Sequence, residues 1–171
     1  MTTESLWVDL DDYLKQYFID TMGENSDFTT LRLEDVFCTV IQDIADFDGR
    51  PKPSLAIVGR NMFRRNGGHG DGEVHYDRQM PYLIVFVTEG DQETAVRDAK
   101  ILDARAEKVI RDLRLDLIND DGEAAEIVGV SNSKITKYKK KPDITKGNRN
   151  FDTENNYYAL TAIELLIEST V

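Results

Sequence analysis

The sequence predicts an α+β domain in which one long helix packs across a small, mainly antiparallel sheet, with further helices near the amino terminus. A run of strand-forming residues extends from Pro81 to Thr88 and turns through Glu89, Gly90 and Asp91 into the longest helical pattern of the chain. Two more strand patterns follow that helix. A length of 171 residues fits one domain spanning 1–171.

The amino-terminal region predicts two helices. Residues 5–22 carry apolar residues at helical spacing on one stripe, and Gly23 ends the pattern. A second helix is expected over 32–46, and the turn from Asp48 to Pro51 ends it. The residues that line one side of this second helix are Leu33, Val36, Phe37, Val40, Ile41 and Ile44.

The next segment combines short strands with a glycine-rich loop. A strand is expected from Ser54 to Val58, and another resumes near residues 73–76. Between them, residues 60–72 form the most flexible stretch, because four glycines within 67–72 adopt positive φ angles freely.

The central strand is apolar on both faces, which predicts that both faces are covered. Small and apolar residues then recur at helical spacing from Ala95 to Leu117. Asp91 is positioned to cap the helix, while Arg111 and Arg114 lie near its negative end.

After the long helix, a turn over 119–122 leads to one long or broken strand over 125–138. The last strand covers 157–167, with one apolar face and one mixed face. The order helix, helix, strand, strand, long helix, strand, strand is typical of the α+β class.

Composition favours a protein that folds in a cytoplasm. The start of the chain is polar, and no apolar run approaches the roughly 20 residues that span a bilayer. The single cysteine, Cys38, has apolar neighbours and is expected to be a buried, unreactive thiol. A net charge of −11 argues against sequence-specific nucleic-acid binding.

Charge is distributed unevenly along the chain. Before residue 131 there are 14 Lys and Arg against 27 Asp and Glu, whereas from 131 onward there are 7 against 5. All seven of those later cations lie in a basic arm, residues 134–149, with one acid, Asp143. Three interpretations remain open: contact with phosphates, with Tyr138 stacking on a base; a solvated hairpin tip; and an electrostatic complement to the acidic body of an identical neighbour.

Catalytic and cofactor motifs are weak. His69, Asp71 and His75 supply metal-binding residue types, but they lie in or beside the glycine-rich loop and not on rigid elements. The glycines lack the following Lys-Ser or Lys-Thr of a phosphate-binding loop. We therefore expect no enzyme activity, no catalytic residue, no metal site and no cofactor.

The order of elements resembles the tail terminator (tail completion) proteins of long-tailed bacteriophages over about residues 5–168. The stretches that carry the resemblance are the early helices, the turn Asp48-Gly49-Arg50-Pro51, the strand Met80–Val87, the acidic entry Glu89-Gly90-Asp91, the helix Ala95–Leu117 and the closing strand Tyr157–Leu165. The chain departs from compact members of that family in its extended amino-terminal region and its glycine loop.

This resemblance implies a structural virion protein. Six copies would form a ring on the tail-tube protein, end tube polymerisation and bind the head–tail connector protein, with genome DNA passing through the ring. The protein would be made in the host cytoplasm and have no membrane partner. For contacts between subunits or on docking, we single out Lys137, Lys139, Lys140, Lys141, Arg64 and Arg65.

Three alternatives are weighed beside it. Head-closure and tail-tube proteins are also small ring-forming proteins of phage necks and tails, although a tube protein would show more strand. An enzyme or ligand-binding domain would use the loop that bears His69 and His75 over a pocket. A bacterial adaptor would bind an acidic partner through its lysine arm.

Overall fold

The computed structural model describes residues 6–40, 44–59, 62–66, 76–115, 124–131, 134–140 and 157–170. These residues form an α+β fold, as the sequence predicts. Its elements are α1 (Leu6–Met22), β1 (Asp35–Thr39), the short 3₁₀ helix η2 (Ile44–Phe47), β2 (Ser54–Gly59), β3 (Phe63–Asn66), β4 (Tyr76–Gly90), α2 (Gln92–Arg111), β5 (Ala124–Val130), β6 (Lys134–Lys139) and β7 (Tyr157–Thr170).

The seven strands of the described residues belong to one sheet built around the long antiparallel pair β4 and β7. The other edge of β4 pairs with β3 at its start and with β2 farther along. The other edge of β7 pairs with β6 at its start and with β5 farther along. β1 is parallel to β2 and lies outermost on that side. Every pairing except β1 with β2 is antiparallel, so the sheet is mainly antiparallel as expected.

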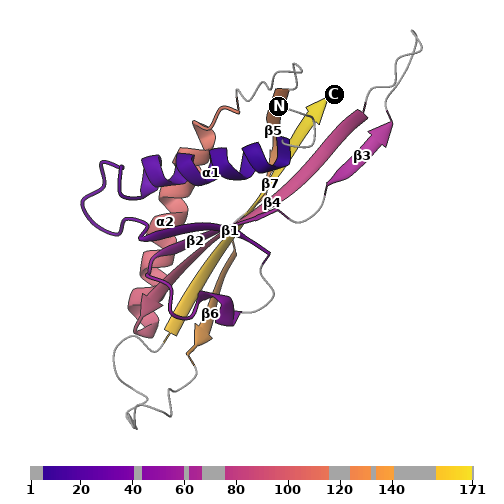
Figure 1. The fold of residues 1–171 in the computed structure, drawn as a ribbon. Coiled ribbons are helices and arrows are strands. Elements are labelled where there is room, and N and C mark those ends of the chain that lie inside the picture. The colour runs from indigo at the N-terminus through magenta and orange to yellow at the C-terminus, as the bar shows by residue number, and fades with distance from the viewer. Residues whose placement is uncertain are drawn as a thin grey trace.

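Both long helices cover the same face of the sheet (Figure 1). Their buried stripes meet the alternate residues of β4 and β7 that face them. This main core contains Leu10, Leu14, Phe18, Leu102, Ala106, Ile110, Tyr82, Ile84, Phe86, Ile163, Leu165 and Ile167. We call this side of the sheet the helix face and the opposite side the open face.

The long helix α2 lies close to the sheet because its buried stripe begins with small residues. Ala95 and Ala99 are fully buried and pack against Ala159 of β7. The hydroxyl of Thr88 on β4 donates to the Ala95 carbonyl at 2.6 Å, which satisfies a buried polar group. Asp91 caps the helix as predicted, and its carboxylate accepts from the backbone N–H of Thr94 at 2.8 Å.

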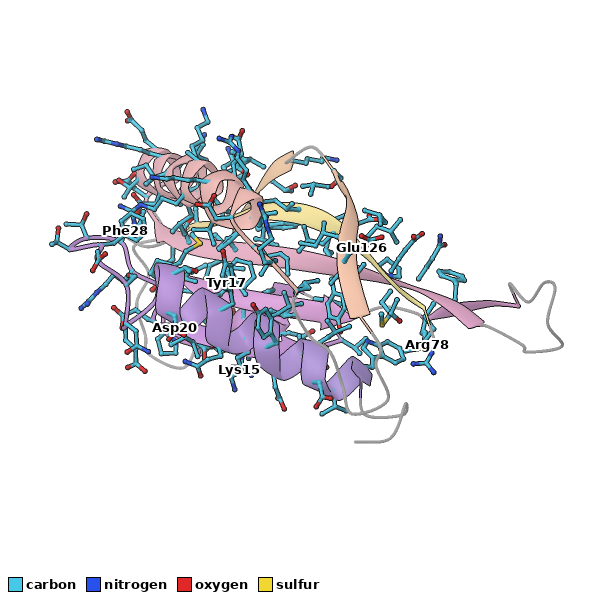
Figure 2. The ribbon with its side chains drawn as sticks, turned by 90° about the horizontal axis from the view of Figure 1, so that it is seen from above. Lys15, Tyr17, Asp20, Phe28, Arg78 and Glu126 are labelled. Carbon is cyan, nitrogen blue, oxygen red and sulfur yellow. The ribbon has the colours of Figure 1, made fainter. Side chains whose placement is uncertain are left out.

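Helix α1 is held by phenolic hydrogen bonds as well as by its apolar stripe. Tyr13 and Tyr17 donate to the carbonyls of Arg114 and Val109 at 2.7 and 2.6 Å, and Figure 2 shows Tyr17 between the two helices. On the sheet side, Tyr82 of β4 donates to the Asp11 carboxylate at 2.7 Å. Burial is the main cause that raises the pKa of the Asp11 carboxyl.

The predicted second helix over 32–46 is wrong. Residues 35–39 form strand β1, and among the described residues of this range only the single turn η2 is helical. Val36 is buried in the main core while Phe37 is buried in the cluster on the open face. Val36 and Phe37 are both apolar because they are buried on opposite faces of the strand. Adjacent apolar residues of this kind also occur on one side of a helix, so the sequence pattern was consistent with a helix. The turn that follows is confirmed, with Gly49 at a φ of 76°.

Two other predictions need adjustment. The loop expected over 60–72 contains strand β3, which pairs with the start of β4 and extends beyond the helices (Figure 1). The long or broken strand over 125–138 is broken: β5 and β6 are separated at Ser131, whose backbone N–H donates to the Glu164 carbonyl.

The open face is apolar and partly covered. Phe47 of η2 is fully buried against this face, in a cluster with Phe37, Ala56, Val58, Val85, Val87 and Tyr158. Farther from η2, Leu83 and Ala162 are half-buried and Glu164 is exposed. No helix in the described ranges is long and apolar enough to cross a membrane.

Candidate functional site

The rim of the sheet gathers the charged residues that the sequence singles out. β6 forms part of one rim and β1 forms the other, and no strand among the described residues pairs with the outer edge of either. We call β6 (Lys134–Lys139) the basic edge. The acidic flank comprises α1, β1 and the chain between them, residues 6–40, in which eight Asp and Glu face two Lys and Arg.

Strand geometry divides the predicted lysine arm between two faces. Lys137 is opposite Ala159, which packs under α2, so Lys137 and Lys139 lie on the helix face. Lys134 is opposite Ala162 and lies on the open face. Lys137, Lys139 and Lys134 are all exposed. The Lys137 ammonium also lies 5.7 Å from the centre of the Tyr157 ring, a cation–π contact at the start of β7.

Lys140 is engaged inside the fold, unlike its neighbours. Its ammonium forms an ion pair with the Glu89 carboxylate at the end of β4, and both side chains are more than half buried. The same ammonium lies 4.8 Å from the centre of the Tyr158 ring. A lysine held in this way joins the end of β6 to β4 and β7 and is a structural residue in this chain.

Tyr158 is the centre of the contacts on the open face. Its hydroxyl donates to the Asp48 carboxylate at 2.8 Å, and the Lys52 ammonium lies 5.0 Å from its ring. Lys52 also donates to the Phe47 and Arg50 carbonyls. Burial lowers the pKa of Lys52, and burial together with the Asp48 contact raises the pKa of Tyr158. These bonds fix η2 against the sheet.

The acidic flank meets the outer edge of β1. Partial burial is the main cause that raises the pKa of the Cys38 thiol on β1; the nearby Asp11 and Asp12 of α1 raise it further, and the nearby Lys15 opposes them. On the open face, Asp35 of β1 pairs with Arg50 at 2.9 Å. The surface beside this edge is therefore acidic but carries compensating cations.

Cys38 was expected to be buried and unreactive, and the structure bears on both expectations. The residue is exposed, so the expectation of a buried cysteine is wrong. Its Sγ nevertheless donates to the Asp11 carbonyl at 3.6 Å, and burial of the sulfur under α1 raises the pKa of the thiol to about 11. A thiol with this pKa is a poor nucleophile at neutral pH.

The remaining predicted contact residues are only partly described. Arg64 and Arg65 lie on β3, where they pair with Arg78 and Asp77 of β4. Lys141, His69 and His75 lie outside the described residues, as do Asp71 and most of the arm beyond 140. Within the described ranges, no group of three or more His, Cys, Asp or Glu could hold a metal ion.

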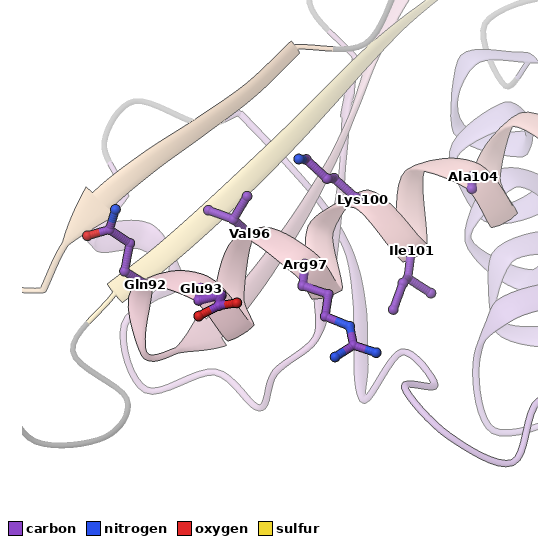
Figure 3. Close-up of a pocket in the computed structure, with 7 residues that line it drawn as sticks. All are labelled: Gln92, Glu93, Val96, Arg97, Lys100, Ile101 and Ala104. Carbon is purple, nitrogen blue, oxygen red and sulfur yellow. The ribbon is translucent and has the colours of Figure 1, made fainter.

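Helix α2 carries two shallow hollows on its outer surface. One, of about 850 Å³, is lined in the described residues by Gln92, Glu93, Val96, Arg97, Lys100, Ile101 and Ala104. Figure 3 shows Lys100 and Arg97 pointing to different sides of the helix, with Glu93 nearby. The second, of about 640 Å³, lies between α2 and the chain after α1, where Arg105 stacks over Phe28 at 4.0 Å. Both hollows are lined by acidic and basic side chains together, so neither concentrates one charge.

Sequence reasoning missed the β1 edge and the contacts of Tyr158. The signal for β1 was its composition, Val36-Phe37-Cys38-Thr39-Val40, which is rich in β-branched and aromatic residues. The contacts of Tyr158 with Asp48 and Lys52 join residues more than one hundred positions apart, and no local pattern indicates them. No protein-family model matches this chain, and no curated protein matches it.

Proposed function

We propose that this chain is a structural protein of a phage tail that assembles head to tail into a ring. In this role it caps the tail tube, ends tube polymerisation and presents a surface to the head connector. The resemblance in element order supplies the biological setting, now without the second early helix, because β1 lies where that helix was expected. The observation that carries the proposal is that each side of one sheet ends in an edge that no described strand occupies, the basic edge on one side and β1 beside the acidic flank on the other.

The placement of these edges allows a repeating head-to-tail assembly. Because they lie on opposite sides of the sheet, a contact between them uses a different surface of each copy. Such a heterologous contact repeats and gives a ring when the rotation between copies closes. Opposite charge on the two sides steers unlike edges together and opposes contact between like edges.

The test is the mass and shape of the purified protein. Mass determination by light scattering, together with negative-stain electron microscopy, would be made across protein concentrations with and without divalent cations. We expect a ring with a mass near six copies of the 19.5 kDa chain. A monomer under every condition contradicts the proposal, and ligand- or metal-dependent stabilisation of that monomer would favour the enzyme alternative.

A further inference from the structure

We propose that β6 of one copy pairs along the outer edge of β1 of the next copy, so that one sheet continues into the other. This inference rests on the ring proposed above and specifies its subunit contact. Addition of a strand to an exposed sheet edge provides main-chain hydrogen bonds, and neighbouring side chains then set the specificity.

The two edges match in length. β1 has five residues and β6 has six. At about 3.3 Å per residue, a five-residue overlap would extend for roughly 17 Å, which is an ordinary strand length in a sheet. The chain therefore offers two strands of nearly equal length, each with one side paired to its own sheet and an outer edge that no described strand occupies.

The charges select this pairing over the alternatives. Lys134, Lys137 and Lys139 line the basic edge, so pairing of two basic edges would place like charges together. When β6 pairs with β1 of the next copy instead, its lysines lie beside the acidic flank of that copy. Lys137 and Lys139 share the helix face with Cys38, and the charged residues of α1 near Cys38 are Asp11, Lys15 and Asp12. The Asp11 carboxylate already accepts from Tyr82 of β4, so continuation of the sheet brings the lysines toward the net negative charge of the acidic flank as a whole.

The native cysteine allows a direct test. Lys137→Cys or Lys139→Cys would give each copy one thiol at each edge, both on the helix face. Oxidation with copper phenanthroline in mildly alkaline buffer, which partly offsets the raised pKa of the Cys38 thiol, should then link successive copies, and a non-reducing gel should show a ladder up to the full ring. The unsubstituted chain has a single cysteine and can give at most a linked dimer.

Lys134→Cys is the matched control, because its side chain lies on the open face while Cys38 lies on the helix face. We expect at least about tenfold less ladder from this variant, since disulfides require Cβ atoms about 4 Å apart. A ring in which neither helix-face variant gives more ladder than the control overturns strand pairing but leaves the ring intact. A chain that never exceeds a monomer overturns both proposals.

Charge reversal gives a second, independent readout. Lys137→Glu with Lys139→Glu should raise the concentration needed for half-assembly by about tenfold, because two attractions become two repulsions. The control is Arg97→Glu with Lys100→Glu, which makes the same change in net charge at exposed positions on α2. Equal weakening by both pairs would show that total charge matters and would contradict the specific contact.

Discussion

Replacing Phe47 by alanine tests whether η2 is an integral cover of the open face. The Phe47 side chain is 0% exposed, and its ring meets Phe37 edge to face with centroids 5.8 Å apart. The Arg50 guanidinium lies over the other ring of the pair, 3.6 Å from the Phe37 centroid. Loss of the Phe47 ring therefore opens a space beneath η2 and exposes apolar side chains on β2 and β4.

The expected loss of stability follows from burial. Truncation of a buried phenylalanine to alanine costs about 3–5 kcal/mol, the sum of lost transfer free energy and the remaining cavity. The aromatic pair accounts for about 0.5–1.5 kcal/mol of stabilisation beyond area burial. η2 is a single turn and can move inward to fill part of the cavity, so we expect a loss of about 3 kcal/mol for Phe47→Ala.

Urea unfolding followed by the fluorescence of the single tryptophan, Trp7, measures this loss. Phe63→Ala is the matched control, because Phe63 is 55% exposed and the same change there should cost no more than about 0.5 kcal/mol. Each variant would be unfolded at two protein concentrations, since assembly adds to apparent stability. A loss for Phe47→Ala below about 1 kcal/mol, or equal to that of the control, would refute the structural role of η2.

Three further predictions concern polar groups of the fold. Tyr82→Phe should lower the free energy of unfolding by about 1.5 kcal/mol, because the Asp11 carboxylate loses its phenolic donor, and the pKa of Asp11 measured by NMR should rise further; an unchanged pKa would contradict this role of the hydrogen bond. The hydrogen bond from the backbone N–H of Thr94 lowers the pKa of Asp91. This carboxylate therefore stabilises the fold above its unfolded-state pKa, and the contribution disappears as pH falls through its folded-state pKa. Asp91→Asn should differ from the parent in free energy of unfolding at pH 7 and converge with it in acid, and a difference that stays constant with pH would count against the argument. Thiol labelling of Cys38 should accelerate with pH through about 11, and a midpoint near 8.5 would show a solvated thiol.

The long elements could be predicted from local pattern, although α2 ends at Arg111 and not at the expected Leu117. α2 combines a continuous buried stripe with a capping aspartate, and α1 has a stripe that repeats over four turns. β4 and β7 are long enough for alternation and strand propensity to agree, as Tyr82, Ile84 and Phe86 illustrate on the helix face. In these segments, local preference and tertiary burial favour the same structure.

The strands at the rim of the sheet could not be predicted from short stretches of sequence, because they depend on contacts between distant residues. Five residues of β1 become a strand because they pair in parallel with β2, about nineteen positions along the chain, and the adjacent Val36 and Phe37 are buried on opposite faces. The lysine arm was treated as one surface, whereas the alternation of a strand places Lys137 and Lys139 on one face and Lys134 on the other. Lys140 could not be assigned from sequence, because its partner Glu89 is 51 residues away.

The separation between core and rim makes the assembly proposals testable without loss of folding. The main core lies between the helices and the centre of the sheet, whereas Lys137 and Lys139 are exposed at one edge. Exposed substitutions away from special features usually change stability by no more than about 0.5 kcal/mol. Lys140 is different, since replacing it leaves the more than half-buried Glu89 carboxylate without its ion pair. An assembly defect in the Lys137 and Lys139 variants would therefore report on the edge, whereas one in a Lys140 variant would first require proof that β6 remains in place.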